Sequence, residues 1–283
     1  MIKYFLKIIT LYDCIMRVIN TIRGIKMSIR KNSVTDISYD LIGNEQSNRT
    51  LLFIHGAGGN MEVLRALANQ FSDYKCVLVD LPGHNLSGGV IPKKVSDYAT
   101  ALEKFIQSEK QLLGDQITCI GHSMGGCLCL ELALRKLPEI KQIVILNSAA
   151  HIELNKKFMQ KIRNGKVDKL YLYKCSGSYI NPRIIGYFLK NFNELNRSKN
   201  DMIKDFLMVE KYDIRKEIKD IKLPTLIITG EKEILALVEY SKFMHSQIEG
   251  SKLLIMKKVA HLMPIVVPEK LSICIKDFLN KNN

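Results

Sequence analysis

Short apolar runs alternate with longer stretches of helical periodicity along most of the chain. Six of these runs predict strands, at 50–54, 76–79, 117–120, 142–146, 225–229 and 253–256. Elsewhere, apolar residues recur every three or four positions, which predicts helices at 63–71, 96–113, 127–136 and 271–279. Strands that alternate with helices are typical of a mostly parallel central sheet flanked by helices, so we expect an α/β fold.

The alternation stops between residues 147 and 224, where the composition becomes basic, aromatic and helical. An insertion of this size within an α/β chain is best explained as a helical cap over one edge of the sheet. We therefore expect residues 28–148 and 218–283 to form the core, and residues 149–217 to form the cap.

The first 26 residues carry apolar side chains at helical spacing, interrupted by charged residues. No small-residue cleavage site follows, so we do not expect a signal peptide. Three interpretations stay open: a helix packed on the domain, an interfacial membrane anchor, or an upstream extension of a protein that functionally starts at Met27. In each case, residues 1–27 form an amphipathic extension outside the α/β core.

The net charge of +14, from 42 Lys and Arg against 28 Asp and Glu, is concentrated in two segments. Residues 1–26 hold five basic residues against one acidic residue, and residues 151–217 hold fifteen against eight. No RNA-binding or helix-turn-helix signature accompanies the charge, so we expect no nucleic-acid partner. Lysines on solvated helix surfaces explain such a charge, and the alternative is an anionic substrate or an anionic membrane surface that meets these segments.

The cysteines and the absence of cofactor motifs narrow the class of protein further. The seven cysteines form no CxxC pair, so we expect a reducing, cytoplasmic location, with membrane association through residues 1–26 as an open alternative. No HExxH, CxxC or carboxylate cluster points to a metal. The glycine-rich turn at 56–59 lacks both the P-loop lysine and the dinucleotide fingerprint. We therefore expect neither a metal nor a cofactor.

Gly121, Ser123 and Gly125 form a Gly-x-Ser-x-Gly sequence directly after a predicted strand and directly before a predicted helix. Such a strand-turn-helix elbow forces the serine into a strained backbone conformation that small neighbours tolerate. It exposes the hydroxyl above the sheet, and the Met124 N–H lies at a helix start, where anions are stabilised. The sequence therefore predicts that Ser123 is a nucleophile.

Five motifs together resemble the α/β-hydrolase superfamily, in its lipase, esterase and thioesterase-like branch. They are His-Gly-Ala-Gly-Gly at 55–59, Asp-Leu-Pro-Gly-His at 80–84, Gly-His-Ser-Met-Gly-Gly at 121–126, Leu-Pro-Thr-Leu-Ile-Ile-Thr-Gly at 223–230 and Ala-His-Leu at 260–262. The match runs over residues 51–279, and the resemblance implies a catalytic triad in the chain order Ser, acid, His.

The resemblance also implies which residues complete the site. His261 follows the last predicted strand at the family's base position, although Ala260 stands where relatives commonly have glycine. Glu233 occupies the usual aspartate position, and the neighbouring Glu231 is the alternative acid. The backbone N–H groups of Ala57 and Met124 are the implied oxyanion donors. Some relatives carry the acid after the fourth strand, where this chain has Asn147.

We expect a serine hydrolase that cleaves a small-molecule carboxylic ester or thioester through an acyl-enzyme. The basic cap suggests an anionic substrate, and the amphipathic extension suggests a lipid-like one. Two alternatives stay open: a lyase that cleaves C–C bonds with the same triad, and a non-catalytic binding protein of the same fold. The acyl chain length, the pathway and the oligomeric state do not follow from the sequence.

Overall fold

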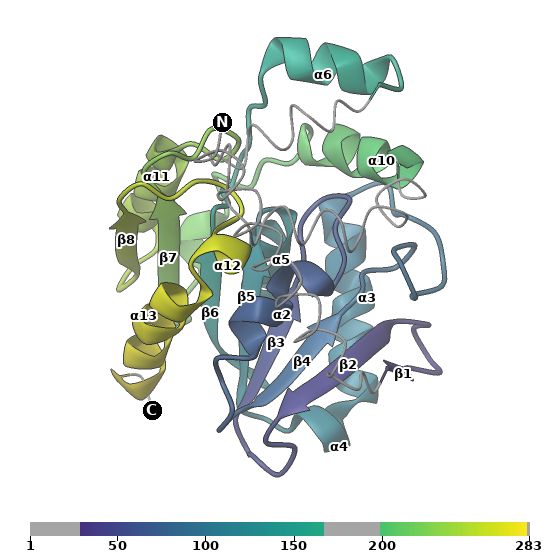
Figure 1. Ribbon diagram of the computed structural model, residues 1–283, viewed down its shortest axis with the longest axis vertical. Coiled ribbons are helices and arrows are strands. Elements are labelled where there is room, and N and C mark those ends of the chain that lie inside the picture. Colours follow the sequence, from purple (N-terminus) through teal and green to yellow (C-terminus); the bar gives the residue numbers. More distant parts are fainter. Residues whose placement is uncertain (1–28, 167–198, 282–283) are drawn as a thin grey trace, which may run out of the picture.

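An eight-stranded sheet runs through the centre of the molecule (Figure 1). The computed structural model describes residues 29–166 and 199–281. The strand order is β1-β2-β4-β3-β5-β6-β7-β8; the pairs β1–β2 and β2–β4 are antiparallel, and every other pair is parallel. This confirms the expected α/β fold with a mostly parallel sheet. The strands are β1 (Arg30–Lys31), β2 (Ser38–Gly43), β3 (Thr50–Ile54), β4 (Lys75–Val79), β5 (Ile117–His122), β6 (Ile140–Leu146), β7 (Thr225–Gly230) and β8 (Lys252–Met256).

Alternate side chains of the central strands divide the core into two layers. In β3, Leu52 and Ile54 belong to one apolar cluster, whereas Leu51 and Phe53 belong to the other. The first cluster includes side chains of α3 (Val95–Ser108), α5 (Met124–Leu134) and α11 (Val238–Gln247). The second includes side chains of α2 (Glu62–Ala68), α12 (Met263–Val266) and α13 (Pro268–Lys281). Helices therefore cover both faces of the sheet, as the continuous burial of strands such as β3, β5 and β7 requires.

The antiparallel strands β1 and β2 extend the sheet beyond the six strands predicted from the sequence. The polar residues Ser38 and Asp40 interrupt the apolar pattern of β2, although both are buried. Arg65 of α2 explains the burial of Asp40, because its guanidinium donates to the carboxylate at 2.7 Å. A buried ion pair therefore occupies a position that the sequence pattern marks as exposed.

The segment expected to form the cap contributes two described helices, α6 (Lys156–Arg163) and α10 (Lys199–Val209), which we call the cap helices. They lie together beyond one end of the sheet (Figure 1), and Phe158 meets Phe206 edge to face at 5.0 Å between ring centroids. Residues 167–198 of this segment, and the predicted extension at 1–27, lie outside the described residues.

Two short elements complete the described chain. The helix expected at 96–113 is divided at Glu109 into α3 and α4 (Lys110–Leu113), and the 3₁₀ turn η1 (Ile218–Asp220) leads into β7. Across residues 29–166 and 199–281, none of the helices combines the length and the apolar character that a membrane span needs.

Candidate active site

Ser123 lies at the sharp turn between β5 and α5, with φ +55° and ψ −122°. Two glycines make this turn possible. A Cβ added at Gly121 would lie 2.1 Å from the Gly125 carbonyl oxygen, and one added at Gly125 would lie 2.0 Å from the Ile54 carbonyl oxygen. The helix therefore starts almost against the sheet. The strained serine conformation costs about 1–3 kcal/mol, which the surrounding packing must offset.

His261 and Glu233 meet in a short, buried hydrogen bond. The distance from His261 Nδ1 to Glu233 Oε2 is 2.7 Å, and the glutamate side chain is completely buried. The other carboxylate oxygen, Oε1, accepts the backbone N–H groups of Leu235 at 2.7 Å and Ala236 at 3.2 Å. The carboxylate orientation is thereby fixed, and the proton on the imidazole is directed to Nδ1.

Glu231, the alternative acid, lies in a different environment. Its side chain is exposed, and its carboxylate accepts the backbone N–H of Lys258 at 3.0 Å. Of the two glutamates that the sequence left open, the fold therefore brings Glu233 against the His261 ring.

The loop that carries His261 is fixed by two buried side chains. Asn147, at the end of β6, donates to the carbonyls of Ala260 at 2.9 Å and His261 at 3.0 Å, and accepts the Gly230 N–H at 2.8 Å. His122 Nε2 also donates to the His261 carbonyl, at 2.8 Å. In the sequence, Asn147 marks only the position at which some relatives carry the acid. Its position directly after a predicted strand was the feature of the sequence that could have indicated this structural role.

The rings of His122 and His261 lie 4.7 Å apart between centroids. Because His122 directly precedes Ser123, this contact brings the imidazole and the serine to the same edge of the sheet. Burial, assisted by repulsion from His261, lowers the pKa of His122 to about 3, so this ring is neutral near pH 7. Within the part of the chain that the structure describes, no hydrogen bond joins the Ser123 hydroxyl to His261. Catalytic hydrogen bonds are often long before substrate binds.

A tight turn from Gly56 to Gly59 lies beside the serine. Gly59 donates its N–H to the Gly56 carbonyl at 3.0 Å, and Gly58 has φ +60°. A Cβ added at Gly56 would lie 2.9 Å from the Ser123 Cβ, so backbone and serine are in near contact. We call residues 56–59 the oxyanion turn. Among the described residues, no acceptor takes the backbone N–H of Ala57 in this turn or of Met124 after the serine. Both donors can therefore serve a bound ligand.

Among residues 29–166 and 199–281, no group of three or more His, Cys, Asp or Glu side chains is placed to hold an ion. The groups that the fold brings to this edge of the sheet are a hydroxyl, an imidazole, a carboxylate and two backbone N–H donors.

Comparisons with known proteins address the family to which the chain belongs. A family model described as the alpha/beta hydrolase fold matches residues 49–174. A crystal structure of a lipase-esterase related protein from Clostridium acetobutylicum ATCC 824 is 35% identical, with a TM-score of 0.81, over 86% of this chain and 99% of that one. A proline iminopeptidase of Saccharolobus solfataricus is 24% identical over 87% of this chain and 89% of its own. A pimeloyl-acyl-carrier-protein methyl ester esterase of Nitrosospira multiformis is 25% identical over 78% of this chain and 90% of its own.

Proposed function

Because the chain belongs to the α/β-hydrolase fold family, we propose that it is a serine hydrolase that cleaves a carboxylic ester or thioester through an acyl-enzyme. The observation that carries the proposal is the buried hydrogen bond from His261 Nδ1 to Glu233 Oε2, formed at the same sheet edge as the strained Ser123 elbow. This arrangement supplies a base with a fixed tautomer close to a hydroxyl that would otherwise be a poor nucleophile.

In the proposed mechanism, the Ser123 Oγ attacks the substrate carbonyl carbon while its proton moves to His261 Nε2. Glu233 stabilises the imidazolium that forms, without taking its proton. The N–H groups of Ala57 and Met124 donate to the oxyanion, and each such donor is worth about 10² to 10³ in turnover. The intermediate collapses when His261 protonates the leaving alcohol or thiol. Water then attacks the acyl-enzyme, with His261 again acting as the base.

The similar proteins and the charge of the cap bear on the substrate class. A methyl ester esterase and a lipase-esterase related protein among the similar proteins support an ester as the scissile group. Lys156, Lys157 and Lys161 make α6 strongly basic, which supports a substrate with an anionic group. A lipid-like acyl chain is the alternative, suggested by the amphipathic residues 1–27.

Labelling with a fluorophosphonate probe tests the proposal, because the probe phosphonylates an activated serine. We expect labelling of the wild type and its loss in both Ser123→Ala and His261→Ala. His245→Ala is the matched control, since this exposed histidine lies on α11 and contacts Ser251. Folded wild type that takes no label would favour the non-catalytic binding protein.

A burst of p-nitrophenol on mixing with a p-nitrophenyl ester would distinguish the hydrolase from a lyase on the same scaffold. An acyl-enzyme mechanism predicts a burst when deacylation is slower than acylation, and the burst approaches the enzyme concentration when deacylation is much slower. Labelled enzyme that cleaves no ester and shows no burst would favour the lyase.

A further inference from the structure

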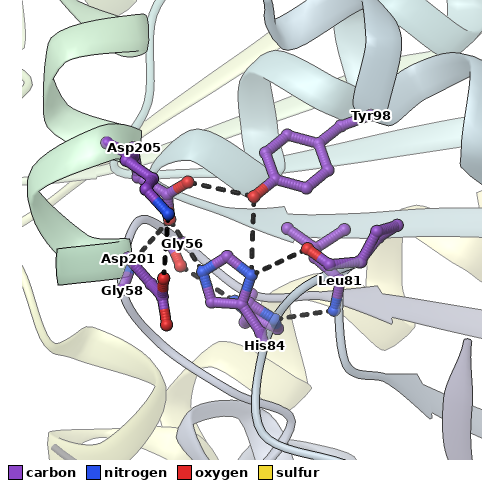
Figure 2. A network of polar contacts seen from close by, with 10 residues as sticks. Gly56, Gly58, Leu81, His84, Tyr98, Asp201 and Asp205 are labelled. Atoms are coloured by element: carbon purple, nitrogen blue, oxygen red, sulfur yellow. Dashed lines mark hydrogen bonds and ion pairs between the residues drawn. The ribbon is translucent and has the colours of Figure 1, made fainter. Parts of the chain in front are cut away.

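A carboxylate of the cap enters the core and bonds to the oxyanion turn (Figure 2). Asp205 of α10 accepts the Gly58 N–H on Oδ2 at 2.7 Å, and the same oxygen lies 2.9 Å from His84 Nε2. Its other oxygen, Oδ1, accepts the Tyr98 hydroxyl at 3.0 Å. Asp205 is fully buried, and it is the one buried charged side chain among the described residues of the cap segment. Its three partners all come from the core.

The hydrogen-bond partners of His84 indicate the charge of this cluster. His84 Nε2 faces the Asp205 carboxylate, and Nδ1 lies 3.2 Å from the Pro82 carbonyl oxygen. Since both ring nitrogens face acceptors, the ring is fully satisfied when both carry a proton. Burial lowers the pKa of His84, but the hydrogen bond and attraction to Asp205 outweigh burial, so the pKa is raised. With both ring protons present, the positive charge of His84 balances the Asp205 carboxylate. The charge of Asp201, a second carboxylate of α10, also raises the pKa of His84.

The neighbouring His55 has the opposite state. Its Nδ1 donates to the Gly56 carbonyl at 2.8 Å, and its Nε2 accepts the Leu81 N–H at 3.0 Å, which requires a neutral ring. Burial and the charge of His84, whose ring lies 5.1 Å away, lower the pKa of His55 to about 3. His55 therefore holds the start of the oxyanion turn from the core side.

Ala57 lies between the two fixed groups. The Gly56 carbonyl before it is held by His55, and the Gly58 N–H after it is held by Asp205. The cap helix also closes over Gly58, where an added Cβ would lie 2.5 Å from the Met202 Cγ. The Ala57 N–H belongs to the same peptide group as the Gly56 carbonyl, and the Gly58 N–H belongs to the next one. Fixing both peptide groups fixes the direction of the Ala57 N–H, which donates to the oxyanion in the proposed mechanism.

We propose that Asp205 is a positioning residue for the oxyanion turn, so that docking of the cap helix α10 and assembly of the oxyanion hole are one event. This inference rests on the proposed function, and it assigns the cap a part in turnover beyond enclosing the substrate. The contact between Gly58 and Asp205, which are 147 positions apart in sequence, thereby acts on the reactivity of Ser123.

The test compares Asp205→Ala and Asp205→Asn with wild type in ester hydrolysis. The alanine variant removes the acceptor, and we expect kcat to fall about 10- to 100-fold, below the full loss of an oxyanion donor. The asparagine variant keeps a neutral oxygen for the Gly58 N–H, so we expect a smaller fall, about three- to tenfold. KM should change less than about threefold in both, because the contact acts on the transition state.

Glu210→Gln is the matched control. Glu210 directly follows α10 and pairs with Arg163 of the other cap helix. The variant therefore removes a carboxylate from the cap without changing a contact to the oxyanion turn. We expect its kcat to equal that of the wild type. A cap that merely encloses substrate would instead raise KM in the Asp205 variants and leave kcat unchanged, and that result would overturn the proposal.

Hydrogen exchange of residues 55–61 gives a readout that needs no activity. We expect faster exchange in Asp205→Ala and Asp205→Asn and unchanged exchange in Glu210→Gln. If Asp205→Ala does not fold, the asparagine variant alone decides. Wild type that fails to react with a fluorophosphonate would refute the proposed function, whereas reactive wild type with unaltered kcat and unaltered exchange in the Asp205 variants would refute only this inference.

Discussion

Replacing Glu233 by glutamine would test the proposed catalytic acid with almost no change of shape. The Oε1 position accepts two backbone N–H groups, from Leu235 and Ala236. An amide NH₂ at that position would face two donors, so the amide oxygen must occupy it. The NH₂ group then takes the Oε2 position, 2.7 Å from His261 Nδ1. The surrounding hydrogen bonds therefore dictate the orientation of the new side chain.

That orientation reverses the tautomer of the His261 imidazole. An NH₂ group can only donate to Nδ1, so the ring proton must move to Nε2, the nitrogen that has to accept the serine proton. A triad with the wrong tautomer loses about 10⁴ in kcat, which corresponds to about 5 kcal/mol of transition-state stabilisation. We expect a loss of this order in Glu233→Gln. Glu233→Asp keeps a carboxylate on a shorter side chain, so we expect its kcat to lie between those of the wild type and Glu233→Gln.

Steady-state hydrolysis of a p-nitrophenyl ester measures kcat, and thermal unfolding checks that each variant is folded. Glu231→Gln is the control, because its exposed carboxylate accepts only a surface N–H of Lys258 in the described structure, and we expect its kcat within about threefold of wild type. Equal activities of the two glutamine variants, or a folded Glu233→Gln that keeps a tenth of wild-type kcat, would show that the tautomer argument is wrong.

Three further predictions concern the scaffold. Asn147→Asp keeps an acceptor for Gly230 but cannot donate to the carbonyls of Ala260 and His261, so we expect at least a tenfold fall in kcat and a lower Tm. Gly125→Ala forces a Cβ against the Ile54 carbonyl, and denaturant titration should show a loss of about 3 kcal/mol or more. The folded-state pKa of about 3 for both His55 and His122 lies below the unfolded value of 6.5, so the unfolded state binds more protons between these values. Each histidine should therefore lower the free energy of unfolding by about 1.4 kcal/mol per pH unit below pH 6.5, down to about pH 3. The raised pKa of His84 acts only above pH 6.5, so it leaves the slope below that pH unchanged. The buried Asp80 carboxyl, whose pKa is raised to about 6, has the opposite sign and offsets the loss from one of the two histidines between about pH 6 and pH 3.8. Urea titrations at pH 7.0, 6.0 and 5.0 measure the slope, and a flat profile would contradict the neutral assignment of the two rings.

The sequence predicted the parallel part of the sheet well, because the buried strands β3 to β7 are short, almost purely apolar runs between turn residues. It did not predict β2, since a strand stabilised by the buried pair Asp40–Arg65 carries no apolar pattern. Pairing of this kind depends on a partner from another element, and periodicity contains no information about it.

For the site, local spacing was informative at Ser123, where a strand, a turn and a helix follow in order. It left Glu231 and Glu233 open, because two residues of one loop differ only in where the loop directs them. The hydrogen bond between His261 and Glu233 in the structure favours Glu233, whose catalytic role stays a prediction. Asp205 carried no signal at all, since nothing in the sequence around it indicates a contact with Gly58.

The close approach of α5 to the sheet has a consequence for how the protein can change. No methyl group fits at Gly121 or Gly125 without moving the backbone, so mutational tolerance at the elbow is very low. Variation in the cap helices, by contrast, leaves the backbone of the elbow in place. Even there, a combinatorial library should keep Asp205, since variation at that position would alter reactivity along with selectivity.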